Sequence, residues 1–204
     1  MRVEKFNYND PEELRANTYV VFDEDKNAVV IDPSVDSNGV INYLKKNNLS
    51  LKAILLTHAH FDHVCGVKRL VDEYHVFTYI HPLEKSSLMD PYENCSITFE
   101  KEIIIDVPTK DINDGDALNF LKENIKVLHT PYHTLGSVCF YLEDSHLLFS
   151  GDSLFKRGVG RSDLPTSSPR DMKATLLKLY SLPRETVVMP GHGNNTTIGE
   201  EKAF

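Results

Sequence analysis

The segment THAHFDH, residues 57–63, constrains the fold of this chain more than any other stretch. It contains three histidines and one aspartate, and it directly follows the apolar run LKAILL (51–56). Side chains two positions apart point away from each other on a helix, whereas on an irregular loop after a strand they can converge. The next residues, HVCGVKRLVDEY (63–74), place valines and a leucine on one helical face. The segment therefore predicts a strand, a loop that carries metal ligands, and then a helix.

Other short segments supply further ligand types, and together they complete a set of seven candidates: His58, His60, Asp62, His63, His133 in TPYHTLGS, Asp152 in SGDS and His192 in PGHG. Three neutral imidazoles hold a borderline divalent metal, whereas a carboxylate with two imidazoles makes a harder and more open site. Asp152 ends a predicted strand, so its carboxylate is the best candidate for a bridge between two metals. Metals about 3.5–4 Å apart share a water, lower its pKa and polarise a carbonyl. The set predicts a centre for metal-assisted hydrolysis.

The rest of the chain predicts two β-rich halves with helices outside. Apolar patterning and turn residues place the predicted strands at 17–22, 28–33, 51–56, 76–80, 125–130, 137–143, 146–152 and 186–190. The predicted helices are 40–48, 63–74, 83–90 and 168–182, the last with Ser168 as its cap and Pro169 in its first turn. The first two strands form a hairpin, and helix 40–48 joins its second strand to 51–56 in a βαβ unit.

Composition narrows the class of protein. The chain of 204 residues fits one domain over 1–204 that buries a core without disulfides. A net charge of −8 and the lack of a long Lys/Arg block argue against nucleic-acid binding. Three cysteines at unrelated spacings suit reduced thiols, the N-terminus lacks an apolar signal segment, and no run approaches the ~20 apolar residues that cross a bilayer. We expect a cytoplasmic protein with no membrane or nucleic-acid partner, in an oligomeric state that the sequence leaves open.

The ordered motifs THAHFDH, TPYHTLGS, SGDSLF and PGHG resemble those of the metallo-β-lactamase superfamily across the whole chain. That resemblance implies an α/β fold, the four-layer αββα sandwich. Within the superfamily, GDSLFKRGVGRSDLP (151–165) and GHGNNTTIGEE (191–201) are similar to the glyoxalase II-like thioester hydrolases, the hydroxyacylglutathione hydrolases, and their short bacterial relatives. The implied activity is hydrolysis of a small thioester such as S-lactoylglutathione.

The resemblance also implies a role for each ligand. His58, His60 and His133 would hold one divalent ion, and Asp62, His63 and His192 would hold the other. Asp152 would bridge the two ions and, with Asp62 orienting the attacking hydroxide, would form the catalytic pair. Asp32, at the end of strand 28–33, would support the ligand loop by fixing a histidine tautomer. Zinc is the expected metal, with iron or manganese as alternatives.

Two departures from the family pattern bear on the substrate. Tyr132 stands where the family has glycine before its third histidine ligand, so a phenol is expected beside the metals, either touching substrate or packed as an aromatic. The sequence also lacks the C-terminal basic region with which the longer glyoxalase II enzymes bind glutathione. Arg161, in the cluster with Lys156 and Arg157, is the best candidate to meet an anionic substrate tail.

Two alternative functions use the same residues. A persulfide dioxygenase-like oxidoreductase resembles this chain in GDSLF and GRSD but uses one iron held by two histidines and an aspartate. A lactonase of the same superfamily would apply the same hydroxide to another activated ester. Metal content, oxygen consumption and a panel of esters separate these functions from thioester hydrolysis.

Overall fold

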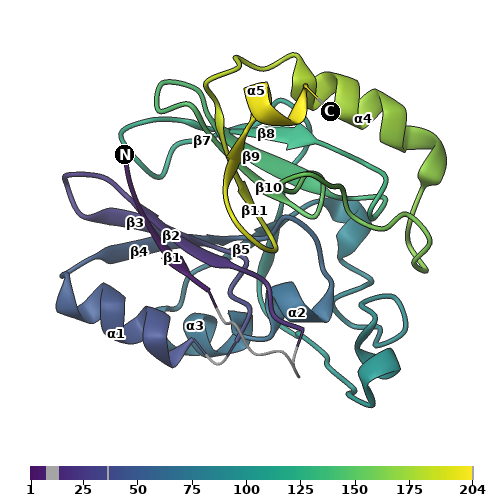
Figure 1. Ribbon diagram of the computed structural model, residues 1–204. Helices are drawn as coiled ribbons and strands as arrows, with labels where there is room; N and C mark the ends of the chain where they lie inside the picture. Colours follow the sequence, from purple (N-terminus) through teal and green to yellow (C-terminus); the bar gives the residue numbers. More distant parts are fainter. Residues whose placement is uncertain (8–13, 36, 204) are drawn as a thin grey trace.

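Two sheets face each other in the structure, a computed structural model that describes residues 1–7, 14–35 and 37–203. Helices cover the outer face of each sheet, so the layers run helix, sheet, sheet, helix (Figure 1). This arrangement confirms the αββα sandwich and the two β-rich halves expected from the sequence.

The first sheet is built from the N-terminal half of the chain. Its strands, in spatial order, are β1 (Arg2–Phe6), β2 (Thr18–Phe22), β3 (Asn27–Ile31), β4 (Ser50–Leu55), β5 (Thr78–Ile80) and β6 (Thr109–Asp111). The pair β2–β3 is antiparallel, as the predicted hairpin requires, and β3–β4 is parallel, as the predicted βαβ unit requires. Both predictions are confirmed.

The second sheet is built from the C-terminal half. Its strands, in spatial order, are β12 (Thr196–Thr197), β11 (Val187–Pro190), β10 (Leu147–Gly151), β9 (Val138–Leu142), β8 (Ile125–His129) and β7 (Ala117–Leu118). The pairs β8–β9 and β9–β10 are antiparallel, and β10 runs parallel to β11. The carboxyl ends of β10 and β11 therefore lie at the same edge of this sheet.

Alternation along the strands separates the core into layers. In β2, Tyr19 and Val21 point between the sheets and pack with Phe140 and Phe149 of the second sheet. Their neighbours on the same strand point to the other face, beneath the helices of the N-terminal half. Residues on both faces of β2 are buried, which explains why this strand reads as a continuous apolar run.

Helices lie on both outer faces of the sandwich. They are α1 (Asn38–Lys46), α2 (Phe61–Val64), α3 (Val67–Tyr74), α4 (Met172–Tyr180) and α5 (Ile198–Glu201), with 3₁₀ turns η1 (Pro82–Glu84), η2 (Ser96–Phe99) and η3 (Pro169–Asp171). Helices α1 and α3 cover the first sheet, and α4 and α5 cover the second (Figure 1).

The helix predicted for residues 63–74 is wrong in one respect, because it is split into α2 and α3 at Gly66. The backbone N–H of Gly66 donates to the carbonyl of Pro33 at 2.7 Å, so the chain here lies against the loop after β3. A Cβ at this position would stand 1.9 Å from the carbonyl oxygen of Val35. Glycine permits this contact, and the contact holds the ligand loop against the end of β3.

The predicted helix 83–90 is also corrected, since only the 3₁₀ turn η1 forms there. The hydroxyls of Ser86 and Ser87 both donate to Glu93. These side-chain bonds fix the turns after η1 to the segment that carries Glu93.

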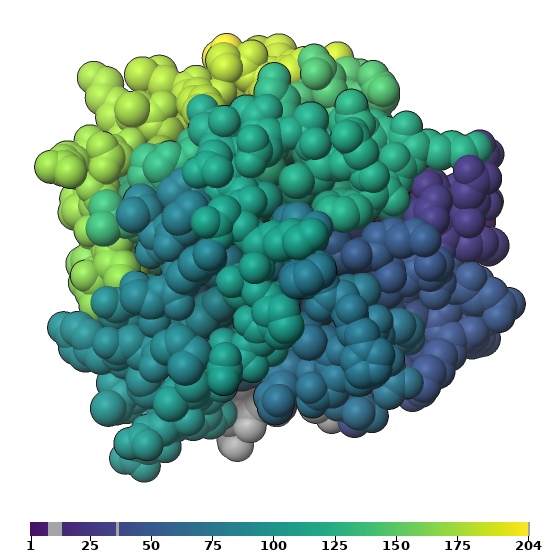
Figure 2. Space-filling model, turned by 180° about the vertical axis from the view of Figure 1, so that it is seen from behind, coloured from purple at the N-terminus to yellow at the C-terminus, as the bar shows by residue number. Residues whose placement is uncertain are grey.

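Seen from behind, the teal middle of the chain lies between the blue N-terminal half and the green and yellow C-terminal half (Figure 2). Among the described residues, no helix combines the length and the apolar character that crossing a membrane requires.

Candidate metal centre

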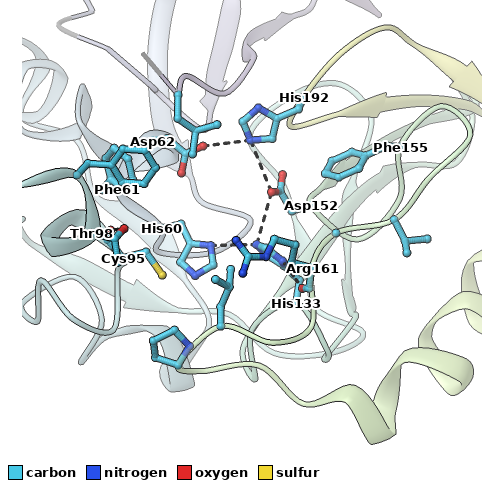
Figure 3. Close-up of a pocket in the computed structure, with 16 residues that line it drawn as sticks. His60, Phe61, Asp62, Cys95, Thr98, His133, Asp152, Phe155, Arg161 and His192 are labelled. Carbon is cyan, nitrogen blue, oxygen red and sulfur yellow. Dashed lines mark hydrogen bonds and ion pairs between the residues drawn. The ribbon is translucent and has the colours of Figure 1, made fainter. Parts of the chain in front are cut away.

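The structure brings all seven predicted ligands to one place, where strand ends of the two sheets meet. The loop after β4 and helix α2 carry the four residues of THAHFDH. His133 follows β8, Asp152 follows β10 and His192 follows β11. Figure 3 shows five of the seven converging from these different segments. Each half of the chain therefore supplies part of the centre.

Three ring nitrogens form a first group. The Nδ1 atom of His60 lies 3.1 Å from Nε2 of His58 and 2.9 Å from Nε2 of His133. Nitrogens bound at about 2.0–2.1 Å to a tetrahedral zinc stand about 3.3 Å from one another. The spacing of these three imidazoles thus matches the donor set of a three-histidine metal site.

Hydrogen bonds behind this group indicate which ring nitrogens carry protons. The Nδ1 atom of His133 lies 2.8 Å from the carbonyl oxygen of Arg161, which only accepts, so Nδ1 holds the proton. The hydroxyl of Thr57 donates to Asp32 at 2.6 Å and therefore accepts from Nδ1 of His58 at 3.1 Å. Both Nε2 atoms are left as lone-pair donors that face the centre.

A second group consists of Asp62, His63 and His192. The Oδ2 atom of Asp62 lies 3.1 Å from Nε2 of His192 and 3.8 Å from Nε2 of His63. One carboxylate and two imidazoles make a harder donor set than the first group. The two groups are therefore chemically unlike, as the sequence predicts.

Asp152 lies between the two groups. Its Oδ1 atom is 3.3 Å from Nε2 of His63, and its Oδ2 atom is 3.5 Å from Nε2 of His133 and 3.6 Å from Nε2 of His192. Gly191 permits this approach, because a Cβ there would stand 2.3 Å from Oδ1 of Asp152. A single carboxylate thus faces donors of both groups.

Asp32 lies behind the ligands, where the resemblance places it. Its Oδ2 atom is 2.9 Å from Nδ1 of His63, and its Oδ1 atom accepts the backbone N–H of Thr57 at 2.8 Å. The residue is buried and has a φ of 48°. Its carboxylate holds the His63 ring and the start of the ligand loop together.

Electrostatics give the two groups different proton affinities. Burial, reinforced by the neighbouring His133, lowers the pKa of His60 to about 3. Burial also lowers the pKa of His58. Burial acts the same way on His63, but nearby carboxylates, above all Asp62, outweigh it and raise the pKa of His63. His58 and His60 are therefore neutral at pH 7, which is the state that binds a metal.

The carboxylate between the groups is held ionised. Burial by itself would raise the pKa of Asp152, yet His63 and His192 hold it well below its usual value. Among the described residues, Nε2 of His63 and Oδ1 of Asp152 are buried without a hydrogen-bond partner. Buried polar atoms of this kind need a partner, and a cation would supply it to both. The donor set therefore fits a pair of divalent metal ions.

Glu84 also belongs to the candidate centre, although no sequence motif predicts it. It is 1% exposed, and its two oxygens accept the backbone N–H of Ala59 at 2.8 Å and of Gly136 at 2.9 Å. Ala59 stands between two ligands, and Gly136 is three residues after His133. One carboxylate thus ties together the two loops that carry the first group. A lone glutamate after His81-Pro82 carries no sequence signal for this role.

Of the two roles that the sequence leaves open for Tyr132, its position in the structure favours the packed aromatic. The side chain is fully buried, and its hydroxyl donates to the carbonyl of Ser153 at 2.5 Å and accepts the N–H of Gly160 at 3.1 Å. The phenol therefore braces the backbone after Asp152 from behind, as a packed aromatic, and does not line the pocket.

A pocket of about 490 Å³ opens over the candidate ligands. Arg161 lies on its wall, but the guanidinium also bonds the carboxylate of Asp163 through Nε at 2.9 Å and Nη2 at 3.0 Å. The residues of the wall are Leu14, His60, Phe61, Asp62, Cys95, Thr98, Phe99, His133, Asp152, Phe155, Val159, Gly160, Arg161, Leu164, Pro165 and His192 (Figure 3).

Comparison with known proteins identifies the family. Residues 11–192 match the Metallo-beta-lactamase superfamily. The chain belongs to this superfamily. The fold and the superfamily predicted from the sequence are thereby confirmed.

Relatives match over nearly their whole length. The solved structure of BLEG-1 B3 metallo-beta-lactamase is 35% identical, with a TM-score of 0.92 over 100% of this chain and 97% of that one. A di-iron-bound form of TTHA1623 is 36% identical, with a TM-score of 0.84 over 95% of this chain and 94% of that one. The hydroxyacylglutathione hydrolase GloC of Haemophilus influenzae is 31% identical over 192 residues, 93% of this chain and 91% of GloC.

Proposed function

We propose that this protein is a metal-dependent hydrolase of small thioesters, for which S-lactoylglutathione is the reference substrate. The observation that carries this proposal is the position of Asp152, whose carboxylate faces an all-histidine group and an Asp/His group at once. The similarity to GloC supports a thioester as the substrate class. The whole chain, 1–204, acts as one domain in this proposal, because ligands come from both sheets.

Each ligand has a role in the proposal. His58, His60 and His133 hold one divalent ion, and Asp62, His63 and His192 hold the other, with Asp152 between them. Ions held there would supply two things, a bound water of lowered pKa and polarisation of a substrate carbonyl.

The chain itself orients the reactants. Asp62, the second member of the catalytic pair, accepts a hydrogen bond from the attacking water and aims it at the carbonyl. Asp32 and Thr57 fix the rings behind the ligands, so the donor atoms need little reorganisation on binding. Arg161 stands at the pocket wall, where its guanidinium, two of whose donors bond Asp163, is the one group that would meet a single anionic part of the substrate.

Two metal ions per chain are expected, with zinc as the first choice and iron or manganese as alternatives. The di-iron form of TTHA1623 supports both the number and the alternative of iron. Elemental analysis checks this stoichiometry. One iron per chain, with oxygen consumed in the presence of a persulfide, would instead identify the dioxygenase-like function.

The central test is turnover of a substrate panel by metal-loaded protein. We expect free thiol to be released from thioesters, to be lost on chelation and to return on addition of Zn²⁺. Lactone and β-lactam substrates in the same panel separate the other hydrolytic functions. Turnover of either of these without any thioester turnover would refute the proposal.

A further inference from the structure

Beyond the candidate ligands, most of the described wall of the pocket is apolar. Phe61 and Phe99 pack against each other with ring centroids 4.9 Å apart. Phe155 lies beside His192, with centroids 6.0 Å apart. Leu164 and Pro165 continue the same wall. Apolar surface thus borders the donor atoms.

Much of this apolar surface faces solvent. Phe99 is 48% exposed and Val159 is 37% exposed, although both are large apolar residues. Apolar side chains gathered around a concave site mark a place where apolar ligand surface is buried. The pocket of about 490 Å³ lies in the range of sites that take small molecules, which is roughly 300–1,000 Å³.

The polar side chains on this wall are few and are partly paired within the protein. The hydroxyl of Thr98 donates to the carbonyl of Cys95 at 2.7 Å. Apart from the candidate ligands, Arg161 is the one charged side chain among the described wall residues, and Asp163 takes two of its donors. The described wall therefore offers a polar ligand few groups with which to pair.

This distribution disfavours a peptide-like thiol in the pocket. Glutathione carries two carboxylates, an ammonium group and two peptide bonds, and each polar group that loses water without gaining a partner weakens binding. An apolar group has no such cost and gains from burial. The same wall thus discriminates between two kinds of thioester.

Resting on the proposed hydrolase function, we infer that the preferred substrates carry an apolar group beside the reacting carbonyl, a short alkyl or aryl group that the pocket buries. The reaction is hydrolysis: water adds its oxygen to the acyl carbon, the carbon–sulfur bond breaks, and the sulfur leaves as a thiol with a proton from that water. No further reactant is needed.

The test compares thioesters of one thiol, N-acetylcysteamine, with acetyl, butyryl, hexanoyl, benzoyl and lactoyl groups, alongside S-lactoylglutathione and S-hexyl thioacetate. Full burial of a methylene group is worth about fourfold in binding. Because the pocket is open to solvent, we expect hexanoyl to exceed acetyl by about tenfold in kcat/KM. Comparison of kcat/KM for S-hexyl thioacetate with that of the hexanoyl thioester then shows whether the pocket binds the acyl group or the group on sulfur.

A matched pair of variants links this preference to the wall. Phe99→Ser is expected to lower the ratio of kcat/KM for hexanoyl over acetyl by about threefold or more, and Phe99→Leu to restore most of it. Phe77→Ser is the control, because Phe77 is 46% exposed, packs under Lys110 at 4.2 Å and lies outside the pocket. Because a ratio is measured, differences in metal loading cancel.

The outcomes separate this inference from the function on which it rests. Thioester turnover with no trend in chain length, or with S-lactoylglutathione preferred tenfold over hexanoyl, overturns the apolar pocket and leaves the hydrolase in place. If Phe99→Ser and Phe77→Ser lower the hexanoyl-to-acetyl ratio of kcat/KM equally, the apolar pocket is also overturned and the hydrolase function stays in place. No turnover of any thioester overturns both.

Discussion

Single side chains behind the candidate ligands decide which ring nitrogens face the metal centre. A chain of hydrogen bonds from Asp32 through the Thr57 hydroxyl reaches Nδ1 of His58, and the carbonyl of Arg161 does the same for His133. The lone pairs of both rings are therefore aimed before any metal arrives. At this scale the chemistry depends on individual atoms, so single substitutions test it.

Asp152→Ala is expected to lose metal and activity together. The substitution removes the one carboxylate that faces both ligand groups, and it leaves His63 beside an empty space. Elemental analysis and thioester turnover check this, with Asp72→Ala as a control at an exposed aspartate that lies outside the pocket. Full activity in Asp152→Ala would rule out a bridging role.

Tyr132→Phe is expected to cost stability and to leave the ranking of substrates unchanged. The phenol hydroxyl bonds two backbone groups in a buried place, and loss of such bonds costs about 1–3 kcal/mol. Urea unfolding measures the loss, and kcat/KM over the ester panel measures the ranking. A changed ranking in a variant of full stability would return Tyr132 to the substrate-contacting role.

At the scale of elements, the centre depends on loops that are fixed to one another. Gly66 holds the ligand loop to the end of β3, and Glu84 joins that loop to the loop after β8. Burial raises the pKa of the Glu84 carboxyl, while hydrogen bonds from Thr134, Ala59 and Gly136 act against that shift. These contacts set the distance between ligands that lie 73 positions apart in the sequence.

Glu84→Gln is expected to weaken binding of the metal at His58, His60 and His133. The amide keeps one acceptor and turns an NH₂ group towards a backbone N–H, so one of the two loops loses its bond. Substitutions behind metal ligands typically cost about 10–100-fold in affinity. Competition with a chelator should therefore show one of the two ions bound at least tenfold more weakly.

Glu93→Gln is the matched control for this prediction. Glu93 is on the same segment and also accepts two hydrogen bonds, but from the hydroxyls of Ser86 and Ser87 and not from a ligand loop. Equal metal affinities in the two variants would show that Glu84 only fills space.

For the whole molecule, burial of His60 makes the metal-free protein sensitive to acid. The pKa of His60 is about 3 when folded and near 6.5 when unfolded. Below pH 6.5 His60 therefore binds a proton in the unfolded chain but not in the folded chain, so the free energy of unfolding falls as the pH falls. The loss is about 1.4 kcal/mol per pH unit for this one group.

His60→Asn is expected to reduce this acid sensitivity. Between pH 6.5 and 5.0 the metal-free variant should lose about 2 kcal/mol less stability than the unaltered protein. Urea unfolding in the presence of a chelator at the two pH values measures the difference. The raised pKa of His63 does not alter the expected difference between pH 6.5 and 5.0, since the stability that this group contributes is already present below pH 6.5. Parallel losses in both proteins would contradict the prediction.

Local patterns in the sequence determined much of this molecule. Alternation and apolar runs predict β2, β3 and β4 with their pairing, because strand patterning records which faces are buried. The seven candidate ligands are also visible, since each lies at the end of a predicted strand or in the short segment that follows one. Chemistry that depends on residue type and local spacing can therefore be predicted before the fold is known.

Only the tertiary structure decided what surrounds those ligands. The burial of Tyr132, the link made by Glu84 and the apolar wall formed by Phe61, Phe99 and Phe155 all join segments that are far apart in the sequence. The break at Gly66 likewise depends on contact with the loop after β3. Such contacts arise when two sheets pack face to face, and local sequence carries no record of which distant backbone will lie against a side chain.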